Sequence, residues 1–257
     1  MCIRDRNKTE SKKKTEIINL KPTKLSEKAI SNITNNYIND SSIAFFYRSL
    51  FDSYASIPQN HRELIIFKDN YDLILNSIKK NRKVCITLKN GEVIPDVSIY
   101  TIEAAKEELY NYVLYVNSNN KPLTSRLNHI KYISLSNEKR EIGDEAIAIF
   151  QKQIKYGVQY PIYSINEETV IIKLNARGQK LFKKIYLYRP IPDKIDGDLY
   201  YFNCSHNQIL HYFKRFGYDA LIISPTFLTQ KMRDYYFFAN KKYDKLLFKT
   251  KDKISNN

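Results

Sequence analysis

The sequence predicts an α+β protein built from small modules, and three observations predict it. Apolar residues recur at helical spacing in two stretches near the N-terminus, residues 25–37 and 43–54. Short strand-like segments then follow one another between residues 83 and 135. From residue 169 onward, strand-like segments alternate with helical ones. This order of elements favours an α+β architecture.

The first fourteen residues are set aside as a leader. The stretch from Met1 to Arg6, MCIRDR, resembles a translated sequencing-adapter scar, and residues 7–14 are polar. Such polar segments cannot bury enough apolar surface to order themselves, so we expect residues 1–14 to be disordered and in part non-native. A longer reading frame upstream of this leader is therefore one expectation.

Residues 15–57 form the first expected module. A short strand over residues 15–21 closes at Pro22, and the two helical stretches follow. Strand, helix, turn and helix, in "IINLKPTKLSEKAISNI" and "NDSSIAFFYRSLFDSYA", resemble the ribbon-helix-helix fold. That resemblance implies that strands of two chains pair and enter the major groove of DNA. The alternative is a helical linker to another domain.

The resemblance also implies which side chains of this module contact DNA. Because side chains of a strand alternate between its faces, Ile17, Asn19 and Lys21 would face the groove. Ser41 and Ser42 lie at the start of the second helix, where free backbone amides bind phosphate.

A connecting helix over residues 58–82 leads into the second module, residues 83–137. Asn90-Gly91 is a strong hairpin signal between the first two of its strands. Several short strands with such turns predict a small barrel. The strands are expected at residues 83–88, 93–100, 110–116, 125–128 and 130–135.

Residues 138–167 are expected to be a linker with one helix, residues 145–155, and residues 168–248 a third module. Its elements predict a small ferredoxin-like α+β domain. They alternate as a strand at 169–174, a helix at 176–186, a strand at 199–203, a helix at 205–216, a strand at 220–223 and a helix at 225–243. The polar tail, residues 249–257, is expected to fray.

Composition indicates a polyanionic partner. The chain has 42 Lys and Arg against 27 Asp and Glu, a formal charge of +15. Cations that contact phosphates release condensed counterions, so such an excess favours nucleic acid. An AT-rich genome would also raise the Lys count, but it does not explain the shortage of acids. The 21 Tyr residues, with no Trp, offer rings on which bases can stack.

The sequence lacks the motifs that mark several other classes of protein. The three cysteines are widely spaced without a CxxC pair, and the four histidines show no metal-ligand spacing. There is no P-loop, no GxSxG motif, no signal peptide and no run of about 20 apolar residues that could span a membrane. We therefore expect a cytoplasmic, non-enzymatic protein without metal or cofactor.

Residues 83–136 resemble a WYL domain, an Sm-like barrel found in bacterial regulators. The stretch "EELYNYVLYVN" occupies the place of the signature strand, although the triplet reads Asn111-Tyr112-Val113 and lacks the Trp. The stretch "SRLNHIKYI" resembles the Arg-containing strand, with Arg126 at the first Arg and His129 where a second Arg is common. "YFKRFGYDALIISP" and "LTQKMRDYYFFANKKY", within residues 168–245, resemble the extension that follows many WYL domains.

The WYL resemblance implies a pocket for nucleotides or single-stranded nucleic acid. Tyr112 would stack on a base, and Arg126 would clamp a phosphate or a base edge. Ser125, Asn128 and His129 would add hydrogen bonds. Strand alternation places Ser125 and Arg126 on opposite faces, so only one of them faces the pocket fully. The alternatives are a core ring for Tyr112 and a surface ion pair for Arg126.

The whole order of modules therefore indicates a regulator. The first hypothesis is a homodimeric, ligand-responsive transcription factor that binds DNA through the N-terminal module and senses a nucleotide effector through the WYL barrel. The second is an RNA-binding accessory protein, because the same order resembles WYL accessory proteins of RNA-targeting CRISPR effectors. A fragment that has lost its DNA-binding domain is the third.

Overall fold

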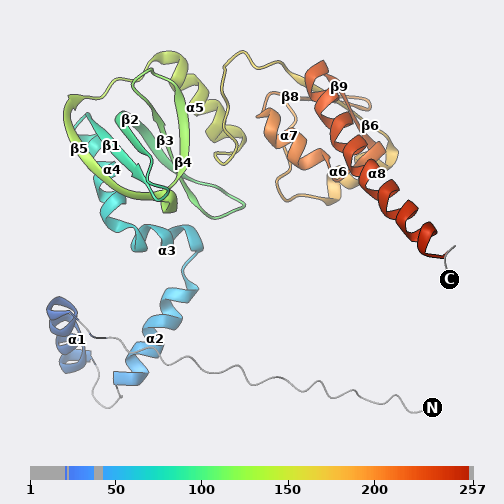
Figure 1. The fold of residues 1–257 in the computed structure, drawn as a ribbon. Helices are drawn as coiled ribbons and strands as arrows, with labels where there is room; N and C mark the ends of the chain where they lie inside the picture. Colours follow the sequence, from blue (N-terminus) through green and yellow to red (C-terminus); the bar gives the residue numbers. More distant parts are fainter. Residues whose placement is uncertain (1–20, 22, 38–42, 255–257) are drawn as a thin grey trace, which may run out of the picture. The chain divides into compact units, whose positions relative to one another are not determined.

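A computed structural model of the chain describes Lys21, residues 23–37 and residues 43–254 (Figure 1). The chain divides into two compact units, residues 1–56 and 57–257. The expected strand over residues 15–21 lies outside the described residues except for Lys21, which is exposed and has no regular secondary structure. Ile17, Asn19, Ser41 and Ser42 also lie outside them.

The first unit contains the two helices that the sequence predicts, α1 (Lys24–Tyr37) and α2 (Ile43–Ser56). A reciprocal cap fixes the start of α1. The amide of Thr23 donates to Ser26 Oγ at 2.7 Å, and the amide of Ser26 donates to Thr23 Oγ1 at 3.2 Å. Each hydroxyl thus satisfies an amide that the helix itself leaves unpaired.

The second unit opens with two short helices, α3 (Gln59–Ile66) and α4 (Lys68–Lys79). The sequence predicted one connecting helix here, and the break at Phe67 corrects that prediction. Phe67 leaves the helical conformation, with φ −103° and ψ 33°, while its amide still donates to Glu63 O. Ile74 of α4 is fully buried in the barrel interior, so α4 covers the barrel.

The barrel is a bent antiparallel sheet of five strands in the order β4-β3-β2-β1-β5. The Asn90-Gly91 hairpin predicted between its first two strands is present, with Gly91 at φ +91°. A short 3-10 turn, η1 (Leu127–His129), joins the two edge strands, so the fourth strand ends at Arg126, before its predicted end, and begins earlier, at Pro122. The strands are β1 (Arg82–Leu88), β2 (Val93–Ala104), β3 (Asn111–Val116), β4 (Pro122–Arg126) and β5 (Ile130–Lys139).

Strand β3 is buried on both of its faces. Val113 and Tyr115 point into the barrel interior among aliphatic side chains from β1, β2 and α4. Tyr112, Leu114 and Val116 point the other way and pack with Phe150 of α5 (Asp144–Tyr156). The residues of β3 therefore read as a continuous apolar run, with period-2 alternation deciding which core each one joins.

The C-terminal domain has the order β-α-β-β-α-β followed by a long helix. Its antiparallel sheet runs β7-β8-β6-β9, which is the ferredoxin-like arrangement. The sequence did not predict β7, and the last helix extends beyond the predicted end. The elements are β6 (Val170–Leu174), α6 (Ala176–Lys184), β7 (Lys194–Asp196), β8 (Leu199–Phe202), α7 (His206–Phe213), β9 (Ala220–Ser224) and α8 (Thr226–Ile254).

Among the described helices, none combines the length and the apolar character needed to cross a bilayer. The mixed content of helices and antiparallel strands confirms the predicted α+β class.

Candidate ligand site on the barrel

The two residues on which the predicted site depends most are direct neighbours. Tyr112 on β3 is the antiparallel partner of Arg126 on β4. Side chains of paired residues lie on the same face of a sheet, about 5 Å apart at Cβ. Both therefore emerge on the side of β3 that faces away from the barrel interior.

Arg126 stacks on Tyr110, the residue just before β3. The guanidinium carbon of Arg126 lies 3.4 Å from the ring centre of Tyr110, a close cation–π contact. The Nε atom of Arg126 is buried and has no hydrogen-bond partner within the described residues. A buried donor without a partner costs about 1–3 kcal/mol, so this N–H group is available to donate to an oxygen of a ligand.

Tyr112 is largely buried, with 8% of its surface exposed, and its hydroxyl donates to Glu108 Oε2 at 2.5 Å. Burial, the hydrogen bond to Glu108 and the charge of Glu108 raise the pKa of Tyr112, and the nearby charge of Arg126 lowers it. The ring that the sequence assigns to stacking is thus packed in a core, and the ring that the Arg126 guanidinium contacts is that of Tyr110.

The other predicted site residues lie around η1 and on the opposite face. Ser125 points into the barrel, where its hydroxyl is 2.9 Å from that of Tyr115. Asn128 places its Oδ1 atom in a buried position without a partner among the described residues. His129 is exposed, and its carbonyl accepts from the amide of Lys89. The structure therefore brings Arg126 and Tyr112 together and separates them from Ser125.

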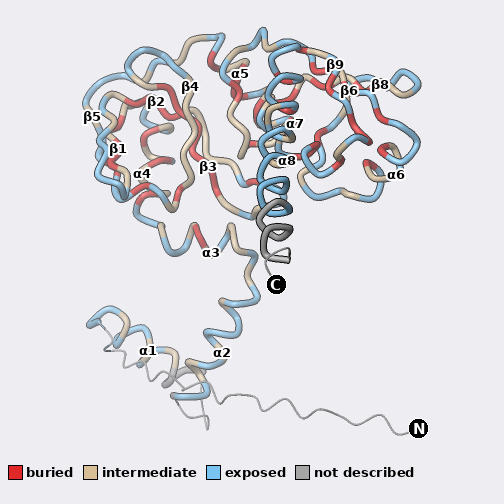
Figure 2. The backbone as a smooth tube through the Cα atoms, turned by 45° about the vertical axis from the view of Figure 1, so that its right-hand side comes forward, coloured by how far each residue is buried: buried red, intermediate tan, exposed pale blue. Residues whose placement is uncertain are grey.

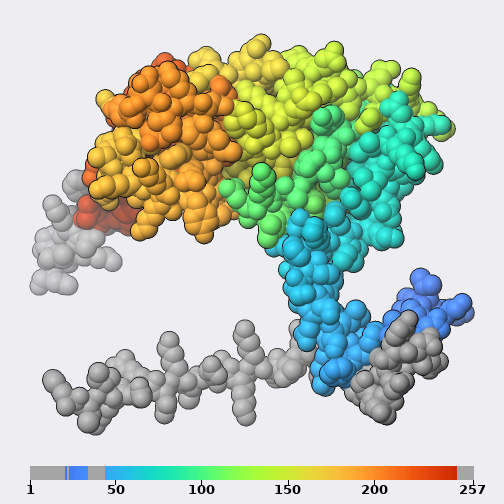
Figure 3. All heavy atoms as spheres, turned by 180° about the vertical axis from the view of Figure 1, so that it is seen from behind, coloured from blue at the N-terminus to red at the C-terminus, as the bar shows by residue number. Residues whose placement is uncertain are grey.

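A buried carboxylate that the sequence analysis missed lies beside this site. Glu63 on α3 accepts hydrogen bonds at 2.7 Å from both the amide and the Nδ2 atom of Asn111, the first residue of β3. Its other oxygen, Oε1, is buried without a partner in the described structure. Figure 3 shows the light-blue residues of α3 against the green residues of the barrel. No local pattern could have indicated this contact, because 48 residues separate the two partners.

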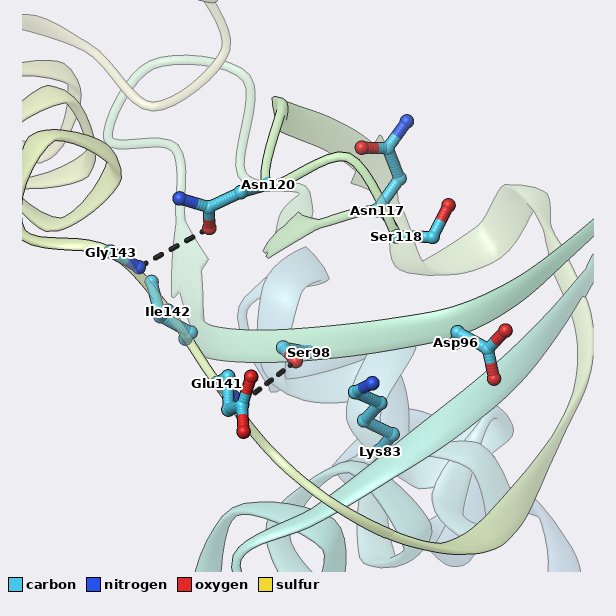
Figure 4. A pocket seen from close by; sticks show the side chains of 9 residues that line it. All are labelled: Lys83, Asp96, Ser98, Asn117, Ser118, Asn120, Glu141, Ile142 and Gly143. Atoms are coloured by element: carbon cyan, nitrogen blue, oxygen red, sulfur yellow. Dashed lines mark hydrogen bonds between the residues drawn. The ribbon is translucent and has the colours of Figure 1, made fainter.

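The barrel also has a cavity of about 390 Å³ away from these residues (Figure 4). Ser98 Oγ accepts from the amide of Glu141 there, and Asn120 Oδ1 accepts from the amide of Gly143. Lys83 donates to Glu138 at 2.7 Å, and this hydrogen bond raises the pKa of Lys83. No residue of the predicted site lines this cavity, whose wall consists of Lys83, Asp96, Ser98, Asn117, Ser118, Asn120, Glu141, Ile142 and Gly143.

Fold and site together define a class of protein: a small antiparallel barrel with a stacked arginine, followed by a ferredoxin-like domain. No family model matches the chain, and no curated protein matches it. Among solved structures the chain is similar to one described as a CRISPR Cas-related protein, with a TM-score of 0.60 and 20% identity. The match covers 79% of this chain and 59% of that one, so this chain spans less than two thirds of its length.

A second solved structure is proteasome accessory factor B/C (PafBC) of Arthrobacter aurescens. Its TM-score is 0.30 at 17% identity, over 69% of this chain and 27% of that chain. At 20% identity the first similarity supports the α+β fold alone, and the TM-score of the second is too low to add to it.

Proposed function

We propose that this chain is a nucleic-acid-binding, ligand-responsive transcriptional regulator of the WYL type, without enzymatic activity or a bound cofactor. Its barrel senses a nucleotide or a short single strand, and its N-terminal helices belong to a DNA-binding module. The functional form is a homodimer. Leu50 and Phe51 of α2 are 49% and 56% exposed, which fits helices that a second copy covers.

The observation that carries the proposal is the state of Arg126. Its guanidinium is held flat against Tyr110 at 3.4 Å, yet its Nε atom is buried without a partner among the described residues. Asn128, two residues further along, holds an unpartnered buried acceptor. A phosphate oxygen would satisfy the donor, and an amino group on a base edge would satisfy the acceptor.

The test compares two binding surfaces by fluorescence anisotropy. Arg126→Ala should weaken binding of single strands or nucleotides tenfold to a hundredfold, because a charge-assisted hydrogen bond contributes about 1.5–3 kcal/mol. Arg126→Lys should be nearly as weak, since an ammonium lacks the planar fork. Duplex DNA binding should respond instead to Asn19→Ala and Lys21→Ala.

Lys131→Ala, at an exposed position of β5, is the matched control for loss of one barrel cation. Thermal melts accompany each titration, so that loss of folding is not mistaken for loss of a contact. Unchanged single-strand affinity in a normally folded Arg126→Ala variant would show that this arginine is not the sensor.

A second candidate function is an RNA-binding accessory protein of an RNA-targeting CRISPR effector. Its support is the similar solved structure described as CRISPR Cas-related. Sequencing the nucleic acid that copurifies with the protein separates the candidates. Duplex DNA with a recurring operator favours the regulator, and CRISPR-derived RNA favours the accessory protein.

A further inference from the structure

The positive charge of the protein is concentrated outside the barrel. Residues 168–248 contain 14 Lys and Arg against 7 Asp and Glu, whereas residues 83–137 contain 6 against 5. A barrel that is almost neutral attracts a polyanion only at short range. The C-terminal domain therefore contributes more of the long-range attraction than the barrel does.

Helix α6 gathers four of these cations on one face. Successive residues of a helix are turned by about 100°, so Arg177, Lys180, Lys183 and Lys184 share an arc of about 120°. Gly178 and Phe182 lie on the opposite, buried side. Figure 2 shows exposed positions along α6 in pale blue, and the helix contains no acidic residue.

Most of this charge is not neutralised. The Nε atom of Arg177 lies 3.4 Å from Oδ2 of Asp219, although the side chain of Arg177 remains 69% exposed. Across residues 43–254, no ion pair engages Lys180, Lys183 or Lys184, and all three are exposed. Three cations at neighbouring positions of one helix repel each other, which a bound anion would relieve.

Two tyrosines flank the helix. Tyr186, two residues beyond its end, is 75% exposed, and Tyr218 is 76% exposed. Arg177 Nη1 donates to the hydroxyl of Tyr218 at 3.4 Å, which places that ring at the start of α6. The nine residues of α6 span about 14 Å at 1.5 Å per residue, the length of a few stacked or extended nucleotides.

We propose that α6 is a docking surface for single-stranded nucleic acid. Lys180, Lys183 and Lys184 contact successive phosphates, and Tyr186 and Tyr218 stack on unpaired bases. The exposed rings favour a single strand, because paired bases in a duplex keep their faces covered. This inference rests on the proposed nucleic-acid binding and assigns its phosphate-contacting surface to the C-terminal domain.

The experiment is a salt titration by fluorescence anisotropy of the full chain with labelled oligo-uridine of about 12 nucleotides, within the range of single-strand sites. The triple variant K180Q/K183Q/K184Q should reduce the slope of log K against log salt by about 2, since each single-strand phosphate contact contributes about 0.7. The matched control, K121Q/K131Q/K139Q, removes three exposed barrel cations and should change the slope by less than half as much.

The aromatic contacts are tested with Y186A and Y218A. Each should weaken oligo-uridine binding about fivefold or more, the lower end of base stacking, and leave binding of a duplex of equal length nearly unchanged. A parent chain that binds no nucleic acid contradicts the proposed function itself. If the parent chain binds but the α6 and barrel triple variants change the slope equally, only the assignment of the binding surface to α6 is contradicted. Tighter binding of poly-glutamate or of duplex through the same lysines would overturn the single-strand assignment.

Discussion

The two domains after residue 82 fill their interiors with different side chains. The barrel core is aliphatic, with Ile86, Val97 and Ile99 at its centre and Tyr115 as its only fully buried ring within the described residues. The C-terminal core is a cluster of rings. Phe213 alone contacts four others, with centroids 5.0–6.1 Å apart, namely Phe182, Phe202, Tyr212 and Phe216.

The two domains also differ in where their polar and charged groups lie. The barrel is nearly neutral but encloses buried polar atoms at Arg126, Asn128 and Glu63 that lack partners in the described structure. The C-terminal domain has a well-packed core and bears its cations outside, on α6. Recognition by a few enclosed groups depends on exact placement, whereas recognition by surface charge depends on charge density and tolerates movement.

The largest expected effect breaks the aromatic core. Phe213→Ala should reduce the free energy of unfolding of the C-terminal domain by about 3–5 kcal/mol, because the lost ring leaves a cavity among rigid neighbours. Ile86→Val in the barrel should cost about 0.5–1.5 kcal/mol. Urea unfolding followed by circular dichroism measures both, and Phe227→Ala, at a position 44% exposed, is the control. A cost below about 1 kcal/mol for Phe213→Ala would mean that the ring cluster rearranges.

The next effect concerns how α6 is attached. An added Cβ at Gly178 would lie 2.2 Å from the carbonyl oxygen of Asp219, so backbone must move. Gly178→Ala should therefore destabilise the domain by about 1–3 kcal/mol, although Ala normally favours a helix over Gly by about 1 kcal/mol. Lys180→Ala, at an exposed position of the same helix, is the near-neutral comparison. A stabilised Gly178→Ala variant in the same unfolding assay would contradict this close approach.

Much of the fold could be predicted because its signals are local. Asn90-Gly91 set the hairpin of the barrel, and the alternation of side chains along β4 correctly placed Ser125 opposite Arg126. The short strand β7 escaped prediction because its three residues are exposed and lack an apolar pattern. Its Asp-Gly turn into β8, with Gly197 at φ +60°, was visible in the sequence.

The candidate site was less predictable, because its contacts join distant segments. Glu63 meets Asn111 only after α3 folds onto β3, and nothing near either residue indicates the other. Tyr110 and Tyr112 are equivalent by type, and only packing decides that the first meets Arg126 while the second is buried. Ser205 is the residue just before α7, but its hydroxyl donates to Pro161 O and makes no capping hydrogen bond with the helix.

The smallest effect compares the two cores through their buried tyrosines at alkaline pH. Burial raises the pKa of Tyr212 to about 12, although Arg189 and Arg215 lower it, and its hydroxyl donates to Ile185 O at 2.5 Å. Burial also raises the pKa of Tyr115 in the barrel. Above the ordinary tyrosine pKa of about 10, the unfolded chain releases these protons first, so stability is lost as pH rises toward the folded pKa.

Tyr212→Phe should therefore cost about 1 kcal/mol at neutral pH through the lost hydrogen bond and flatten the decline between pH 10 and 12. The flattening should be less than about 1.4 kcal/mol per pH unit, because solvent screening reduces it. Urea midpoints at neutral pH and near pH 11 measure both the loss of stability at neutral pH and the flattened decline with pH. Tyr115→Phe should act on the barrel transition alone. If both substitutions move one shared transition equally, the barrel and the C-terminal domain unfold as one unit and the contrast between their cores has no separate thermodynamic consequence.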